Sequence, residues 1–423
     1  MKEDFLHYIW KHRLFSDTNL ETTEGEKITV ESVGTHNINA GPDFFNAKIK
    51  IGKTLWAGNV EMHLRSSDWI KHNHGTNKEY DNIILHVVYE NDAELKMKNN
   101  LAIPTLSLKK TINENFVSRY ENLIGSRHRI ACEEDIYRVK SFTIDSWLER
   151  MLVSRLERKS GDILERLKQN KNNWEETFYH LLAKNFGFKL NAQPFEELAR
   201  SLPLSILAKH KNNLPQTEAM LFGAAGLLSK KYNEVYPSSL MKEFNFLKTK
   251  FKLADGIHSP WKFLRLRPAN FPTIRIAQFA ELVHRSSHLF SKILECETAE
   301  RVIGLFDVSA SEYWDTHYVF GKTSASQKKN LGRSAAENLI INTAAPVIFS
   351  YGMYRKEEKL KDRALKFLEE ISPENNSIIK KWESLGIEPR SAFRSQALLE
   401  LMNEYCIEKK CLSCGIGNKL ITS

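Results

Sequence analysis

Three cysteines near the end of the chain have the spacing of metal ligands. They are Cys406, Cys411 and Cys414, and only two other cysteines occur in the 423 residues. Thiolates this close in sequence can converge on one ion, so the spacing indicates a zinc or iron–sulfur site rather than a disulfide framework. For the fourth ligand, Cys132 in a polar connecting stretch is a better candidate than Cys296, which falls in a helical pattern. Such a site would tie the C-terminus to the end of the first domain; the alternative is a set of reduced thiols without a metal.

Two acids stand in neighbouring strand-like runs. Asp43 opens the run that begins at Phe44, and Glu61 lies within the next run. Strand alternation puts Glu61 and His63 on one side, with the apolar residues on the other. Paired carboxylates of this kind bind Mg²⁺ or Mn²⁺, which activates water and holds a scissile phosphate. We therefore predict Asp43, Glu61 and His63 as catalytic residues, with the two acids as metal ligands and His63 as a base or extra ligand. The alternative is a polar sheet edge whose acids pair with Arg65, Lys48 and Lys50.

Further histidines follow closely. His63, His72 and His74, with Asp68, offer nitrogen and oxygen ligands for zinc, manganese or iron, so a hydrolase of another phosphoester is a third interpretation. The simpler interpretation takes His72 and His74 as exposed loop residues. His86 lies in an apolar strand-like run and is expected to be a core histidine.

A stretch in the second half of the chain is rich in arginine and aromatic residues. Between Trp261 and Ala277 it contains Arg265, Arg267 and Arg275, which can hold phosphates while the aromatic rings stack on bases. The net charge of +9 makes a polyanion a plausible partner. We predict these arginines as nucleic-acid-binding residues; the alternative is a helix-packing junction.

The elements that position these residues change character once along the chain. Up to residue 138, a helix over 4–15 precedes strands at 28–33, 44–51 and 54–64, a short helix starting near Ser67, and a strand at 82–89. From residue 143 onward helical spacing dominates, interrupted by prolines. We predict an α+β fold with two domains, an α-β-β-β-α-β domain over 1–138 and a mostly helical domain over 139–423 that ends in the cysteine cluster.

The first domain resembles the PD-(D/E)XK nuclease superfamily through Pro42-Asp43 and Glu61-Met62-His63. The resemblance implies a nuclease-like fold and metal-dependent cleavage of nucleic acid, and it covers the first quarter of the chain. His63 stands where that superfamily has a lysine, so Lys48 or Lys50 would have to supply a displaced ammonium group.

A second resemblance spans nearly the whole chain. The phrases 41–44, 56–63, 67–69, 267–272 and 411–417 are similar to an uncharacterised bacterial family, the domain of unknown function 2851. That resemblance implies no activity.

The start of the chain has acids where a secretory signal is basic, and the apolar stretches fall short of the ~20 residues of a membrane helix. We expect a cytoplasmic protein without a membrane partner that binds DNA or RNA. The preferred function is a metal-dependent nuclease; the alternative is a non-enzymatic nucleic-acid-binding or scaffold protein with a degenerate nuclease-like domain.

Overall fold

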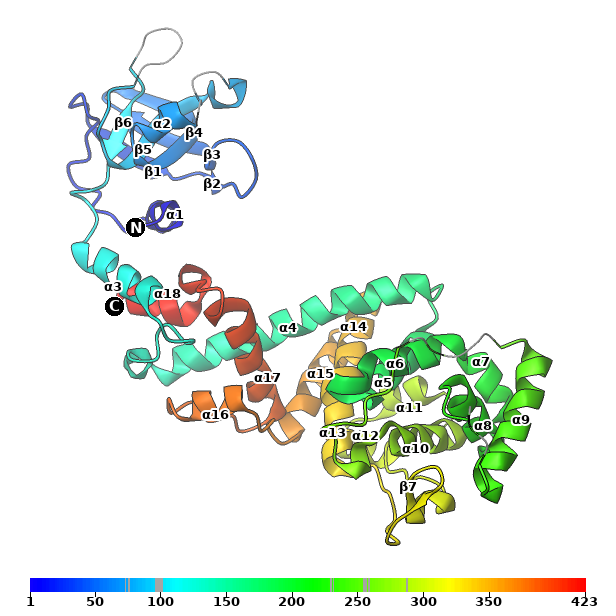
Figure 1. Ribbon diagram of the computed structural model, residues 1–423. Coiled ribbons are helices and arrows are strands. Elements are labelled where there is room, and N and C mark those ends of the chain that lie inside the picture. The colour runs from blue at the N-terminus through cyan, green and yellow to red at the C-terminus, as the bar shows by residue number, and fades with distance from the viewer. Residues whose placement is uncertain are drawn as a thin grey trace. The chain divides into compact units, whose positions relative to one another are not determined.

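The protein has a mixed α+β fold in which a curled sheet of strands precedes a mostly helical region (Figure 1). The computed structural model describes residues 1–423 except 73, 75–76, 96–101, 229, 231, 254–256, 258 and 287. Two compact units are present: Met1–Trp147 with Leu401–Ser423, and Leu148–Glu400. The predicted α+β class is confirmed, and the C-terminal residues pack with the first unit.

The first unit is built on a mixed sheet with the strand order β1-β3-β4-β5-β6, and β2 pairs with β3. Its strands are β1 (Ile28–Ser32), β2 (Thr35–His36), β3 (Phe44–Ile51), β4 (Thr54–Arg65), β5 (Ile83–Glu90) and β6 (Thr105–Ser107). The strands β1, β3 and β4 are antiparallel, whereas β4, β5 and β6 run parallel. The four predicted strands are therefore present, with β2 and β6 as short additions.

Local sequence explains how β3, β4 and β5 come together. Gly52, in the turn between β3 and β4, has a φ of +57°, a conformation that glycine adopts without strain. Gly58 of β4 lies so close to β5 that a Cβ atom would approach the side chain of Ile84 to 2.4 Å. In β5 every residue from Ile83 to Val88 is buried, as the apolar run predicted.

Two helices complete the part of this unit that carries the predicted acids. Helix α1 (Glu3–Lys11) buries its apolar residues, and the indole of Trp10 donates to Val33 O at 3.1 Å. Helix α2 (Asp68–Lys71) connects β4 toward β5. Ser67 occupies the N-cap position of α2, but its hydroxyl donates to Asp92 Oδ2 instead of capping the helix.

The C-terminal residues Leu401–Ser423 belong to the first unit. Helix α18 (Gly415–Thr422) packs against helix α3 (Glu114–Gly125), and Figure 1 shows these two helices side by side. Lys409 donates to the carbonyl oxygens of Ile124 and Ser126 at 2.7 and 2.6 Å. The other short helical segments of the first unit are η2 (Lys78–Tyr80), η3 (Ile136–Arg138), η8 (Leu401–Cys406) and η9 (Cys411–Ser413).

The second unit is helical except for the small hairpin of β7 (His317–Val319) and β8 (Lys322–Thr323). Its helices are α4 (Ser141–Gln169, which begins in the first unit), α5 (Trp174–Phe186), α6 (Phe188–Ser201), α7 (Leu204–Leu207), η4 (Ala208–His210), α8 (Leu214–Ala224), α9 (Val235–Phe251), η5 (Pro268–Asn270), α10 (Pro272–Arg285), α11 (Leu289–Glu295), α12 (Ala299–Leu305), η6 (Glu312–Thr316), α13 (Arg333–Leu339), η7 (Ile340–Ala344), α14 (Ala345–Arg355), α15 (Glu358–Glu370), α16 (Ser377–Glu383) and α17 (Ala392–Glu400).

Prolines shape several of these helices. Pro215 and Pro272 lie in the first turns of α8 and α10, where the missing N–H costs nothing. Pro194 is the exception, because it lies inside α6 close to a kink at Asn191. Within the described residues, none of the helices combines the length and apolar character that crossing a membrane requires.

Candidate metal centre

Asp43 and Glu61 are held side by side by the pairing of β3 with β4. Phe44 pairs with Val60, so the residues next to them, Asp43 and Glu61, lie together on one face of the sheet. The backbone N–H of Asp43 donates to Glu61 Oε2 at 3.2 Å, and the backbone N–H of Met62 donates to Asp43 Oδ2 at 2.9 Å. Each carboxyl group is therefore fixed by the strand that carries the other.

The carboxyl group of Glu61 has an environment that opposes its negative charge. Glu61 is 4% exposed. Burial, and then the nearby Asp43, raises the pKa of Glu61 to about 9. This environment favours the protonated form of Glu61, and a bound cation would favour the ionised form.

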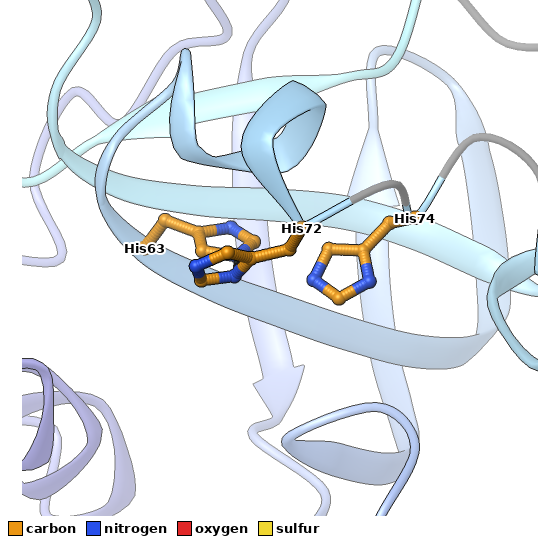
Figure 2. A group of neighbouring side chains, drawn as sticks. All are labelled: His63, His72 and His74. Carbon is orange, nitrogen blue, oxygen red and sulfur yellow. Dashed lines mark hydrogen bonds between the residues drawn. The ribbon is translucent and has the colours of Figure 1, made fainter.

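Three histidines from different elements gather beside Glu61. Among the described residues, His63, His72 and His74 form a group whose ligand atoms all lie within 4.8 Å of one another. Figure 2 shows their rings together, with His63 on the strand and the other two on the segment that follows α2. The prediction of exposed loop residues is right for His72, whereas His74 is half-buried.

His63 connects this group to the core. Its Nε2 lies 3.1 Å from His72 Nδ1, and its Nδ1 lies 2.9 Å from His86 Nε2. His86 is fully buried, which confirms the prediction of a core histidine. Burial, together with the neighbouring imidazoles, lowers the pKa of His63 to about 2 and that of His86 to about 3. The low pKa values favour the neutral form of both rings, and this is the form in which His63 could bind a metal.

Glu61 also meets the histidines directly. Its Oε1 lies 3.2 Å from His74 Nε2 and 3.8 Å from His63 Nε2. His74 Nε2 is buried and has no hydrogen-bond partner. A buried polar atom without a partner is costly, and a metal ion between the nitrogen and the carboxylate would remove that cost.

Helix α1 brings two further residues, Glu3 and His7, to the site. His7 Nε2 lies 3.3 Å from Asp43 Oδ2, and the His7 ring is 5.5 Å from that of His36. Burial, and then Asp43, raises the pKa of Glu3. Glu3 and His7 are four residues apart on a helix and so share one face, and this spacing could have identified them.

The two lysines proposed to replace the missing superfamily lysine lie elsewhere on the sheet. Lys48 pairs with Ala57 and Lys50 with Leu55, toward the other end of β4 from Glu61, and both are exposed. Within the described part of the chain, neither forms an ion pair with Asp43 or Glu61. The acids therefore face imidazoles rather than ammonium groups.

The four cysteines predicted as metal ligands lie in the first unit, whereas Cys296 lies in the second. The four are Cys132, Cys406, Cys411 and Cys414. Burial, and then the neighbouring thiols of Cys414 and Cys411, raise the pKa of Cys132. The same causes, with Cys132 among the neighbours, act on Cys406. Among the described residues, the histidine group is the one set of three or more candidate ligands whose atoms all lie within 4.8 Å of one another. The cysteine sulfur atoms are therefore less tightly gathered than the histidine nitrogens.

The backbone around the last two cysteines is shaped by glycines. The N–H groups of Ile416 and Gly417 donate to the sulfur of Cys414 and lower its pKa, although burial raises the pKa overall. A Cβ atom on Gly417 would lie 2.5 Å from Cys411 O. Only glycine therefore fits where the chain folds back over the cysteines.

The three predicted phosphate-binding arginines have different environments. Arg265 and Arg267 are exposed. Arg275 is 6% exposed and donates to Gln278 Oε1 at 3.0 Å and to Asn270 Oδ1 at 2.5 Å. Arg275 thus fits the helix-packing alternative, because its guanidinium group serves the core of the helical unit.

Comparisons with known proteins identify a family. No curated protein and no solved structure matches the chain. One family model, described as "Protein of unknown function (DUF2851)", matches residues 3–377. This range contains the carboxylates, the histidines and Cys132, and it ends before Cys406. Because the match covers most of the 423 residues, the chain belongs to the DUF2851 family, as the second resemblance predicted.

Proposed function

We propose that this protein binds nucleic acid and cleaves it as a metal-dependent phosphodiesterase of the PD-(D/E)XK type. The observation that carries the proposal is the interlocked pair of Asp43 and Glu61, each hydrogen-bonded to the backbone beside the other. Oxygen ligands fixed in this way suit Mg²⁺ or Mn²⁺. Apart from the short strand β2 and the segment η2, the elements α1, β1, β3, β4, the single-turn helix α2 and β5 follow the α-β-β-β-α-β order that the superfamily resemblance implies.

The chain's own residues have separate roles in this proposal. Asp43 and Glu61 hold the cation, which when bound supplies an activated water and neutralises charge on the phosphate. His63 is a weak base, because burial keeps its pKa about 2. Its two ring nitrogens, each within hydrogen-bond distance of another imidazole, suit it to pass a proton toward the exposed His72 or to act as an extra ligand.

Nucleic acid is the proposed substrate because of charge. The chain carries a net charge of +9, and Arg265 and Arg267 expose guanidinium groups in the helical unit. Arg275 has no place in this interface because it is buried. The competing function is binding without cleavage, and the imidazole of His63 at the superfamily's lysine position favours that competitor.

A cleavage assay separates the two functions. The full chain is incubated with labelled DNA and RNA, in single- and double-stranded forms, with Mg²⁺ or Mn²⁺ and with a chelator. Glu61→Gln keeps the side-chain shape and removes the ligand charge, so we expect the metal-dependent rate to fall at least about 100-fold while binding persists. Glu31→Gln is the matched control, because Glu31 is an exposed acid on β1 of the same sheet. Binding without cleavage by the wild type under every condition would establish the non-enzymatic alternative.

A further inference from the structure

We infer that the N-terminal sheet has a second cation position, formed by Glu61, His63, His72 and His74, that takes a transition-metal dication such as Zn²⁺, Co²⁺ or Mn²⁺. The inference rests on the proposed function only in sharing Glu61 with the Asp43 pair. Metal uptake at this position can be measured without any nucleic acid.

The two oxygens of Glu61 serve different neighbours. Oε2 accepts from the backbone N–H of Asp43 at 3.2 Å. Oε1 faces the histidines instead, at 3.2 Å from His74 Nε2. Glu61 can therefore contribute one oxygen to each of two adjacent positions, which is the arrangement by which two-metal hydrolases hold both ions.

The distances around the second position match the edges of a metal coordination shell. Two ligands bonded to zinc at about 2.0–2.1 Å in a tetrahedron lie about 3.3 Å apart. The pair His63 Nε2 and His72 Nδ1 is separated by 3.1 Å, and Glu61 Oε1 lies 3.2 Å from His74 Nε2 and 3.8 Å from His63 Nε2. These three separations are close to the tetrahedral value, and the remaining histidine ligand atoms, all within 4.8 Å of one another, would close around a bound ion.

The surroundings separate this position from an ordinary hydrogen-bonded cluster. His74 Nε2 is buried and lacks a hydrogen-bond partner even though Glu61 Oε1 is within 3.2 Å. A cation between the two would satisfy both atoms. The second nitrogen of His63 is held by the buried His86, in the way that a second ligand sphere fixes a metal-bound imidazole.

The chemistry of the ligands selects the kind of metal. Three imidazoles and one carboxylate suit zinc, cobalt, manganese or iron, whereas Mg²⁺ prefers oxygen ligands and keeps its waters. His72 is exposed, so the position is open to solvent on that side. An open position leaves room for a water or substrate oxygen, in contrast to a closed structural site.

Cobalt titration of the full chain tests the inference. Co²⁺ held by imidazole and carboxylate gives visible d–d absorption without the intense near-ultraviolet charge-transfer band of thiolate ligands, so the cysteines are separated spectroscopically. We expect these bands in the presence of excess Mg²⁺, and at least a tenfold weaker affinity in the double variant His72→Ala/His74→Ala. His12→Ala is the matched control, because His12 is an exposed histidine at the end of α1.

Each outcome decides one question. Unchanged cobalt bands in the double variant would overturn the inference, as would a wild type that takes up cobalt only with thiolate bands. Circular dichroism of the double variant checks folding, and the single variant His74→Gln, which keeps a polar side chain, gives a second comparison if the double variant unfolds. Cobalt uptake without any nucleic-acid cleavage would support this inference and contradict the proposed function.

Discussion

Glu61 and Glu400 are both buried carboxylates, but their neighbours are of opposite kinds. Glu400, in the helical unit, is 1% exposed and receives hydrogen bonds from Arg158 at 3.0 and 2.6 Å and from Arg155 at 3.3 Å. Glu61, in the sheet unit, has the carboxylate of Asp43 and neutral imidazoles around it. The charge of Glu400 is balanced within the protein, whereas that of Glu61 requires a proton or a cation from outside.

This contrast distinguishes a buried polar group that binds a ligand from one that stabilises the fold. A structural group is surrounded by complementary partners, as Glu400 is, because an uncompensated buried charge is costly. A ligand site gathers groups of one kind, such as carboxylate beside carboxylate and imidazole beside imidazole. The thiols of Cys132, Cys406, Cys411 and Cys414 in the sheet unit are likewise groups of one kind, and burial together with neighbouring thiols raises the pKa of Cys132 and Cys406.

The largest effect is expected at the cysteines. We propose that these four thiols hold a structural zinc ion or iron–sulfur cluster that fastens the C-terminus to the N-terminal unit. Cys411→Ser should then release the metal and destabilise that unit by several kcal/mol, since structural zinc contributes roughly 10–16 kcal/mol in small domains. Elemental analysis and visible absorption of anaerobically purified protein measure the metal, and only a cluster is coloured. Cys296→Ser is the control; wild type with neither metal would reject the proposal.

The two buried glutamates should respond in opposite ways to the same substitution. Glu400→Gln removes the buried carboxylate that Arg155 and Arg158 share, and we expect a loss of roughly 3 kcal/mol in the free energy of unfolding. Glu61→Gln removes a carboxyl group that has no cationic partner, so stability of the metal-free protein should stay unchanged or rise. Urea unfolding in the presence of a chelator measures both. Equal destabilisation by the two changes would remove the distinction between them.

Glu218 offers a pH test within the helical unit. Burial raises its pKa from 4.5 to about 7, although Ser311 and Tyr236 donate hydrogen bonds to it; the nearby Glu281 raises it further. Because the folded pKa lies above the unfolded one, this contribution to stability is complete below pH ~4.5 and is lost as pH rises through ~7. We expect a fall of up to about 3 kcal/mol between these limits.

The variant Glu218→Gln isolates that effect, because its side chain stays neutral at every pH. Urea unfolding at several pH values should give a flatter profile for the variant than for the wild type, with the largest difference at the highest pH. Parallel profiles for the two proteins would mean that Glu218 does not lose a proton in the folded state over this range.

The smallest effect is expected at the exposed arginines. Arg265→Ala and Arg267→Ala should each weaken nucleic-acid binding and reduce its dependence on log salt concentration by about one unit per lost phosphate contact. Lys292→Ala removes the same charge from an exposed position on α11 and serves as the control. An equal change in all three variants would indicate a general effect of net charge rather than an interface.

The strands and the neighbouring acids could be predicted from the sequence because both depend on local pattern. Alternation in β4 places Glu61 and His63 on one face, and the hairpin through Gly52 brings Asp43 beside them. The buried β5 was equally clear from its continuous apolar run.

The rest of the site depends on contacts between distant segments. His7 reaches Asp43 only because α1 packs against the sheet, and no local pattern reports that packing. The burial of Arg275 was hidden for a similar reason: its partners Asn270 and Gln278 are polar residues that look equally suited to a surface. His74 is likewise half-buried beside the ring of Tyr80, and the centroids of the two rings are 4.0 Å apart.

Uptake of Mn²⁺ by the full chain tests most directly the claim that the unbalanced carboxylate pair is a cation site. Electron paramagnetic resonance measures the free ion that remains as protein is added. If the claim is right, this protein binds Mn²⁺, Asp43→Asn and Glu61→Gln each weaken binding at least about tenfold, and Glu31→Gln does not. Equal Mn²⁺ binding by all four proteins, or none by any of them, would contradict it.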